Sequence, residues 1–371
     1  MGYWLKKRLH TETAVDKDAT YRYKLPTVGL FSAFSVRCQA QRYADRASTT
    51  TNQLLHDAIT KVELLSEGTK VLKSLRAREI KALNLFDFRR VGDWQHGENA
   101  DDYNIDTLYL LAGRHLQDKE FMFDMSKLSD PEIALTNALT EDTAEYWKAD
   151  TLEYQIFGWR FMGSPAPVPR GYFRADERVY YTTSAADAEK IVDITIGKKI
   201  RRILFMGHTV GTTTRGHVKK MELEVNEGEF SPVTIDSPME WTWQNILDYM
   251  LDCKVVKCVY LKAVDECEYT DLLMCYPQGV FVTPHVATAD ASARVWDFAN
   301  GLADIRCDVA YTHELVAHGA GYLNSLLIGF DKEPDLSQMF DTAGMGKLKL
   351  ILTETAASKV VSIVVEELIT Y

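Results

Sequence analysis

Short runs of alternating apolar and polar residues dominate the chain, and they predict β-strands. In the clearest run, residues 152–161, apolar side chains stand at even positions as far as Ile156 and at odd positions from Trp159, with Gly158 at the change of phase. A period of two is what a sheet with one buried face requires, and a glycine at a change of phase suggests a β-bulge. Further short runs predict strands at 200–206, 221–225, 255–261 and 279–282.

Helical patterns are few and short, and they are predicted at 78–85, 131–139, 241–251 and 292–302. The second begins with Asp130 before Pro131, an arrangement typical of a helix start because aspartate caps the first turn and proline is tolerated there. Short helices among many strands favour a β-sandwich with decorated loops over an alternating βαβ fold.

The middle and the ends of the chain have their own patterns. Residues 163–171 contain three prolines at every second position, which exclude ladder hydrogen bonds and predict an extended linker. Residues 1–20 are polar and charged, and they predict an arm. Two runs rich in β-branched residues, 347–353 and 360–368, flank a small polar connection and predict a terminal hairpin.

Two blocks, 61–88 and 220–249, share one order of features. Each has an alternating strand, a Glu-Gly turn, a second strand and a short helix that ends in an apolar residue, an aspartate and an aromatic residue. The glycine of each turn tolerates the positive φ that a tight strand connection needs. The blocks predict that the chain contains two copies of one β-rich unit, although Glu-Gly turns are common enough for coincidence to be the alternative.

Composition narrows the range of functions. The chain has 371 residues, is 46% hydrophobic and carries a formal net charge of -11, with a pI of about 5.4. This length suggests two domains or one large one. Proteins that bind nucleic acid through its phosphates usually have a basic face, so direct nucleic-acid binding is disfavoured. No secretory signal or run of roughly 18 apolar residues is present, and we expect a protein made in a cytoplasm.

Several segments carry chemistry without a complete motif. His313 and His318 stand five positions apart, one more than the zinc motif H-E-x-x-H allows. Residues 207–217 lack the Gly-Lys-Ser/Thr end of a phosphate loop, which leaves a weak anion site at Arg215 as an alternative to a plain loop. Residues 101–106 lack the glycine and glutamate of an EF-hand and predict a solvated acidic loop. The six cysteines form no C-x-x-C pair and are predicted to be small buried residues. We therefore predict no metal, no cofactor and no catalytic residues.

With the repeat established, the chain resembles the double jelly-roll major capsid proteins of tailless icosahedral viruses, a family that includes internal-membrane bacteriophages and the adenovirus hexon. The resemblance depends on the entry strand at 25–30, on the block from Val62 to Asp87, and on the final strand at 360–368 preceded by 348–352. Size and two-part layout agree. The chain departs from the simplest members by long insertions at 89–106 and 278–346.

This resemblance implies an all-β fold with a few short helices, built as two tandem eight-stranded jelly-roll sandwiches. The implied layout is an N-terminal arm at 1–20, a first jelly roll at 21–162, a Pro-rich linker at 163–171, and a second jelly roll with long loop insertions at 172–371.

The resemblance also implies a structural, non-enzymatic function. Such a protein trimerises into pseudo-hexameric capsomers that tile an icosahedral virion shell, and it is assembled in the host cytoplasm. The implied partners are other copies of the chain, penton or minor capsid proteins, and an internal viral membrane. Trp4, Lys6, Lys7 and Arg8 would contact a neighbour or anionic lipid, with a solvated terminus as the alternative. Two other functions stay open: a carbohydrate-active or carbohydrate-binding β-sandwich protein, and a phage tail or spike component.

Overall fold

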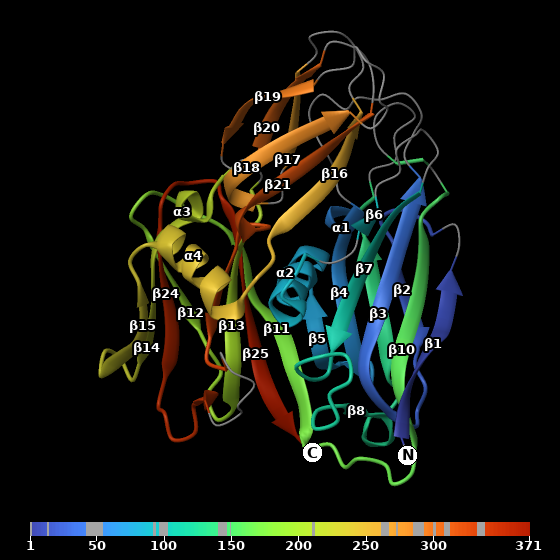
Figure 1. Ribbon diagram of the computed structural model, residues 1–371. Helices are drawn as coiled ribbons and strands as arrows, with labels where there is room; N and C mark the ends of the chain where they lie inside the picture. Colours follow the sequence, from blue (N-terminus) through green and yellow to red (C-terminus); the bar gives the residue numbers. More distant parts are fainter. Residues whose placement is uncertain are drawn as a thin grey trace.

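The computed structural model describes residues 2–12, 15–41, 55–91, 94–95, 103–139, 147–148, 150–209, 212–260, 267–271, 274–284, 293–299, 302–307, 312–331 and 338–371. Two β-sandwiches stand side by side, and a smaller group of strands rises above them at the end opposite to both chain termini (Figure 1).

The first sandwich has two facing sheets. One sheet has the order β1 (Gly2–Glu12), β10 (Glu153–Gly163), β3 (Leu30–Gln41), β7 (Tyr103–Leu111) and β6 (Trp94–Gln95), with β8 (Phe123–Asp124) paired to β3. The other has the order β2 (Thr20–Lys24), β9 (Glu132–Asn137), β4 (Ile59–Ser66) and β5 (Lys70–Leu75). The connections between these strands contain the helices α1 (Leu55–Ala58) and α2 (Ala77–Phe88) and the short 3-10 helix η1 (Met125–Lys127).

The second sandwich repeats this arrangement. One sheet has the order β11 (Gly171–Thr182), β25 (Val360–Thr370), β13 (Lys199–Gly207) and β22 (Ser325–Gly329), with β23 (Phe340–Asp341) paired to β13. The other has the order β12 (Glu189–Asp193), β24 (Leu348–Glu354), β14 (Val218–Val225) and β15 (Phe230–Ile235). Its helices are α3 (Thr214–His217) and α4 (Pro238–Tyr249). The Pro-rich segment connects β10 to β11 without forming a strand, as its prolines predict.

Strand registers show that the two sandwiches are copies of one unit. The pairing of β1 with β10 shifts between Arg8 and His10, and that of β11 with β25 shifts at the corresponding place, between Glu177 and Val179. The pairing of β4 with β9 shifts after Ile59, and that of β14 with β24 shifts after Val218. A β-bulge is a local insertion in one strand, so its recurrence at matched positions is a specific signature. The predicted repeat is confirmed, and Gly2 corresponds to Gly171 while Ile59 corresponds to Val218.

One asparagine in each copy fastens a helix to a strand. The Asn84 amide on α2 donates to the Tyr109 carbonyl oxygen at 2.9 Å, and its Oδ1 accepts from the Tyr109 N–H at 3.0 Å. Asn245 on α4 makes the same two bonds with Leu327, at 3.0 and 2.9 Å. These bonds pair backbone groups inside the protein, where an unsatisfied donor or acceptor is costly, and the Leu327 carbonyl oxygen also accepts from Trp241 Nε1 at 2.9 Å.

We expect Asn84→Ala and Asn245→Ala each to lower the free energy of unfolding by about 1–3 kcal/mol, because each removes two hydrogen bonds to buried backbone groups. Urea unfolding measures the change. Gln244→Ala is the matched control, because Gln244 is exposed and its amide donates to Asp248 on its own helix. Losses no larger than that of the control would show that the asparagines do not hold the helices.

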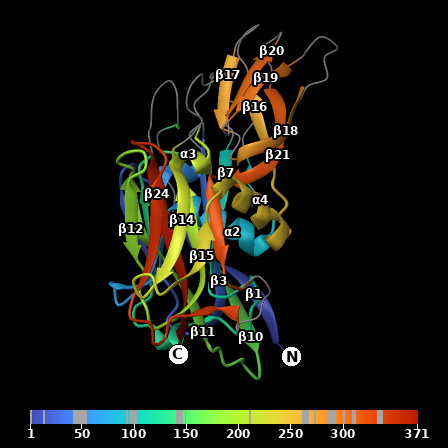
Figure 2. The ribbon, with the colours of Figure 1, turned by 90° about the vertical axis from the view of Figure 1, so that its left-hand side faces the viewer.

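The strands above the sandwiches form a tower, defined here by two three-stranded sheets. One has the order β16 (Lys254–Tyr260), β21 (Thr312–Tyr322) and β18 (Met274–Pro284), and the other has the order β17 (Cys267–Asp271), β20 (Leu302–Cys307) and β19 (Ala293–Ala299). Figure 2 shows the tower on the same end in a perpendicular view. It joins α4 to β22, whereas the equivalent connection from α2 to β7 holds only β6 among its described residues. The added strands therefore begin at Lys254, earlier than the predicted insertion at 278–346.

Four local predictions are wrong. Residues 25–29, predicted as most of an entry strand at 25–30, form the connection between β2 and β3 instead. The helix predicted at 131–139 is absent and Glu132–Asn137 form β9, because Asp130 takes a left-handed φ of 45° and the following residues become a buried central strand between β2 and β4. The helix predicted at 292–302 is also wrong, because residues 293–299 form the strand β19. The two C-terminal runs are strands as predicted, but β24 and β25 belong to opposite sheets, so they do not form a hairpin.

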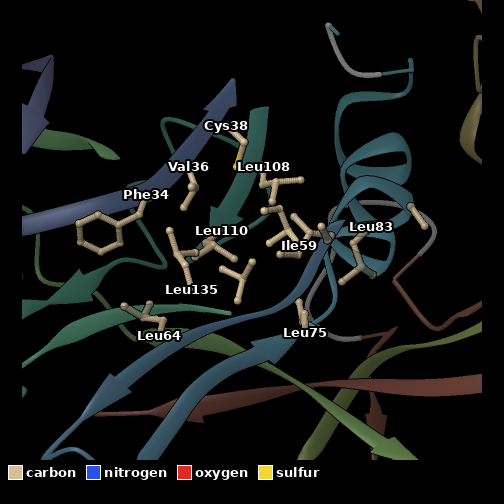
Figure 3. Packing of buried hydrophobic residues seen from close by; sticks show 14 of the residues in the cluster. Phe34, Val36, Cys38, Ile59, Leu64, Leu75, Leu83, Leu108, Leu110 and Leu135 are labelled. Atoms are coloured by element: carbon tan, nitrogen blue, oxygen red, sulfur yellow. The ribbon is translucent and has the colours of Figure 1, made fainter. Parts of the chain in front are cut away.

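The core of the first sandwich lies between its two sheets (Figure 3). Phe34, Val36 and Cys38 of β3 point toward Leu64 and Leu135 of the facing sheet, and all five are buried. Cys38 and Cys253 are buried free thiols, as predicted, and the prediction for the other four cysteines lies outside the described side chains. Within the described part of the chain, no helix is long and apolar enough to cross a membrane.

Candidate functional site

Trp4, Lys6, Lys7 and Arg8 all lie on β1, which the sequence had placed in an arm. The structure instead makes residues 2–12 the edge strand of the first sandwich, paired along their length with β10. A polar segment can form this strand because an edge strand needs no buried face: β10 supplies the partners for its backbone hydrogen bonds. Lys6, Lys7 and Arg8 are exposed and Trp4 is half-buried.

The outer side of this sheet carries an aromatic face, defined as Trp4, Tyr109, Phe157, Trp159 and Phe161. Trp4 meets Phe161 edge-on, with 5.4 Å between ring centroids, and Tyr109 lies 5.6 Å from Trp159. The Lys6 ammonium stands 4.7 Å from the Phe157 ring centroid and 5.0 Å from that of Trp159. The odd-numbered side chains of β10 form this face, whereas Tyr154 and Ile156 point into the core and Gly158 stands on the core side next to Phe31. Aromatic surface with a cation above it is typical of interaction surfaces.

The two sandwiches of one chain meet across a buried charge cluster, defined as Lys73, Asp87, Arg201, Arg202, Asp331 and Glu366. Arg202 bonds Glu366 at 2.6 Å and Asp87 at 2.7 Å. Arg201 bonds Asp331 at 2.6 Å and Glu366 at 3.0 Å. Lys73 reaches Glu366 at 3.2 Å.

Charge balance makes this cluster tolerable inside the protein. Burial raises the pKa of Glu366, but Arg202, Lys73 and Arg201 lower it more, so the pKa lies far below its usual range. Burial lowers the pKa of Lys73, an effect that Glu366 opposes. Buried charges persist only when paired and hydrogen-bonded, and here three cations meet three carboxylates. The cluster therefore fixes how the first sandwich sits on the second. Backbone pairing of β5 with β11 at Lys73–Ala175 and Ser74–Asp176 joins their sheets at the same place.

A second buried group at this junction resembles catalytic chemistry but cannot perform it. The Ser362 hydroxyl donates to Glu79 at 2.5 Å and lies 2.8 Å from His208 Nε2. Ser362 has no exposed surface, and no substrate reaches it. Burial and the nearby Glu177 raise the pKa of Glu79 to about 8, and burial with Arg78 and Arg76 lowers that of His208 to about 3.

Asp106, predicted in a solvated acidic loop, is buried instead. Lys81 Nζ lies 2.5 Å from its Oδ1, and His56 Nδ1 lies 2.7 Å from its Oδ2. Burial raises the pKa of Asp106, but the charge and hydrogen bonds of Lys81 and His56 lower it more, to about 2. These partners lie on α2 and α1, so the group ties two helices to β7. Residues 101 and 102 lie outside the described residues.

The other segments singled out from the sequence show no binding geometry. Residues 312–322, which include His313 and His318, form the strand β21, so the helical spacing of a zinc motif does not apply. Among the described residues, no group of three or more His, Cys, Asp or Glu is placed to hold a metal ion. Arg215 is exposed on α3, where its backbone N–H donates to the Tyr276 hydroxyl at 3.2 Å. Residues 210 and 211 of the Gly- and Thr-rich segment lie outside the described residues.

A cleft of about 790 Å³ opens at the end of the molecule where the chain terminates, between the Pro-rich connection, β25 and the start of β13. Arg170, Lys198 and Lys199 line it together with apolar residues, and Asp341 is the one carboxylate among its lining residues. Most glycoside hydrolases need two carboxylates that flank the bond to be cleaved. This cleft therefore does not favour the carbohydrate-active alternative.

Solved structures identify the fold. The crystal structure of the major capsid protein of Sulfolobus turreted icosahedral virus has a TM-score of 0.61 and 11% identity, over 98% of this chain and 96% of that chain. The crystal structure of the major capsid protein P2 from bacteriophage PM2 has a TM-score of 0.54 and 11% identity, over 100% and 98%. PBCV-1 VP54, as fitted into a reconstruction of the virophage Sputnik, has a TM-score of 0.56 and 9% identity, over 99% and 94%.

These likenesses define the chain as a double jelly-roll protein, all-β with a few short helices. They span nearly its whole length and nearly the whole length of each similar structure. No protein-family model matches the sequence, and no curated protein is similar to it in sequence. The resemblance proposed from sequence is thus confirmed at the level of fold, where the backbone arrangement is shared although few side chains are.

Proposed function

We propose that this chain is a structural major capsid protein of an icosahedral virus. The observation that carries the proposal is the presence of two complete, register-matched jelly rolls in one chain, with a fold likeness to viral capsid proteins over 98% of its length. A shell built from such a chain needs rigid contact between the two units, and the buried charge cluster supplies it. The function is structural rather than enzymatic.

The finer features of the proposal concern assembly. Three chains form a homotrimer whose six sandwiches make a pseudo-hexameric capsomer, and capsomers tile the virion shell after assembly in the host cytoplasm. One jelly roll precedes the Pro-rich linker at 163–171 and the other follows it. The tower would project from the outer face, because it lies at the end opposite to the termini. Penton or minor capsid proteins and an internal membrane are further proposed partners.

We expect native mass spectrometry of the purified protein to give three times the chain mass of 42.1 kDa. A closed ring is the natural product of head-to-tail contact between identical chains. The same measurement in a denaturing solvent gives the chain mass and serves as the control. A monomer would support the carbohydrate-binding alternative instead, and it would contradict the capsid proposal.

A further inference from the structure

The two corresponding helices, α2 and α4, differ sharply in burial. Ten of the 12 residues of α2 are buried, whereas three of the 12 in α4 are. The exposed side of α4 is apolar: Leu247 is 70% exposed, and Met239 and the capping residue Met250 are exposed as well. Leu247 corresponds to Phe86, which is 5% exposed on α2. Exposed apolar residues along one side of a helix indicate a missing partner surface.

The structure shows what covers α2. The outer side of the sheet of β11, β25 and β13 in the second sandwich lies against it, through Arg202 to Asp87 and through Ser362 to Glu79. By the matched registers, Arg202 corresponds to Ala33 and Glu366 to Trp159 in the first sandwich. The surface that would cover α4 in the same way is therefore the aromatic face of the first sandwich.

That face cannot reach α4 within the same chain. Figure 1 shows β14 and β15 at one side of the molecule and β1 at the opposite side. A second copy placed head to tail brings the two together. Within the chain β5 pairs with β11 at Lys73–Ala175 and Ser74–Asp176, and the corresponding pairs between copies are Val233 with Lys6 and Thr234 with Lys7.

Charge complementarity supports the same arrangement. Inside the chain, Glu177 of β11 pairs with Arg76 at 2.7 Å and stands close enough to Glu79 to raise its pKa. The residue that corresponds to Glu177 is Arg8, and the one that corresponds to Glu79 is Glu240. Both are exposed in the single chain. The contact between copies would therefore bring opposite charges together where the internal junction brings two glutamates together.

We propose that α4 and β15 of one copy dock on the aromatic face and on β1 of the next copy, with Arg8 beside Glu240 and Leu247 against the aromatic side chains. This inference deepens the proposed function, on which it rests, by assigning the surfaces that close the trimer. It gives Trp4, Lys6, Lys7 and Arg8 a protein neighbour as their partner.

A charge swap tests the assignment. Sedimentation velocity of the full chain measures the trimer dissociation constant for wild type, Arg8→Glu, Glu240→Arg and the double variant. We expect each single variant to weaken the trimer by at least about tenfold, because it places like charges together, and the double variant to recover most of the loss. Leu247→Asp should weaken the trimer as well. Ile191→Asp is the matched control, since Ile191 is 50% exposed on β12, away from both surfaces.

The outcomes separate this inference from the proposed function. A wild-type trimer that all four variants leave unchanged would overturn the assigned surfaces while the capsid proposal stands. If Arg8→Glu instead abolishes binding to vesicles of anionic lipid and spares the trimer, β1 contacts a membrane and the assignment is wrong. A wild-type protein that is monomeric contradicts the capsid proposal itself. Circular dichroism of each variant confirms that the chain is folded.

Discussion

Replacing Glu366 with glutamine is expected to lower the free energy of unfolding by about 3–5 kcal/mol, because removing one member of a buried ionic group leaves its partners uncompensated. Glu366 accepts hydrogen bonds from Arg201, Arg202 and Lys73, and its carboxylate is nearly inaccessible to water. Glutamine preserves the shape but leaves three buried cations against two carboxylates. Chemical unfolding, followed by tryptophan fluorescence, measures the loss.

Two further variants distinguish a charge effect from a packing effect. Glu222→Gln breaks a surface pair with Lys220 at 3.0 Å, and we expect little change, because exposed ion pairs contribute little. Combining Arg202→Met with Glu366→Gln restores equal numbers of buried charges, so the double variant should cost less than the sum of the single ones. A Glu366→Gln loss as small as that of Glu222→Gln would show that the cluster does not hold the sandwiches together.

Acid is expected to destabilise the protein through two buried histidines. Burial lowers the pKa of His208 to about 3 and that of His217 to about 4, from the usual histidine pKa of 6.5. The Thr209 N–H donates to His217 Nε2 at 3.3 Å, so the neutral ring is required and its Nδ1–H donates to the Thr213 carbonyl oxygen. As the pH falls below 6.5, these histidines bind protons in the unfolded chain but stay neutral in the folded chain. Each histidine therefore removes about 1.4 kcal/mol of stability per pH unit, down to its folded pKa.

Glu79 acts in the opposite direction. Its pKa of about 8 exceeds the usual glutamate pKa of 4.5, so the folded chain holds a proton that the unfolded chain releases. Its contribution is fully present below pH 4.5 and is lost as the pH rises through about 8.

Urea unfolding at pH 5, 6 and 7 tests the histidine effect by comparing wild type with His217→Gln, in which the contribution of His217 is absent. We expect a flatter pH dependence for His217→Gln than for the control variant of exposed His115, His115→Gln. Equal slopes would contradict a buried neutral His217.

The repeat was predictable from sequence because its signals are local. The Glu67-Gly68 and Glu227-Gly228 turns both take positive φ between two paired strands, and each is followed by a 12-residue helix. The apolar residues at odd positions from Trp159 were equally visible, and Trp159 and Phe161 belong to the aromatic face, although Gly158 itself pairs in continuous register with Lys7 and Phe34. Such features depend on residues that are neighbours in the chain, which is why pattern alone reveals them.

Features that depend on distant residues were missed. The pair Asp130-Pro131 is typical of a helix start, but the same pair can precede a strand. Here the following residues form a strand because they are buried between β2 and β4. In the charge cluster Lys73 pairs with Glu366, which lies 293 residues away, and no local sequence pattern predicts that pairing. Asp106 was assigned to solvent because its partners, His56 and Lys81, lie on helices far away in the sequence. The runs at 347–353 and 360–368 were correctly predicted as strands, but in a jelly roll consecutive strands often belong to opposite sheets.

Electron microscopy of the purified protein tests most directly whether one chain supplies two of the six units of a capsomer. We expect particles with threefold symmetry in which six sandwich densities form a ring and three towers project from one side. Particles that contain a single pair of sandwiches, or rings whose number of sandwiches is not six, would contradict the proposed assembly.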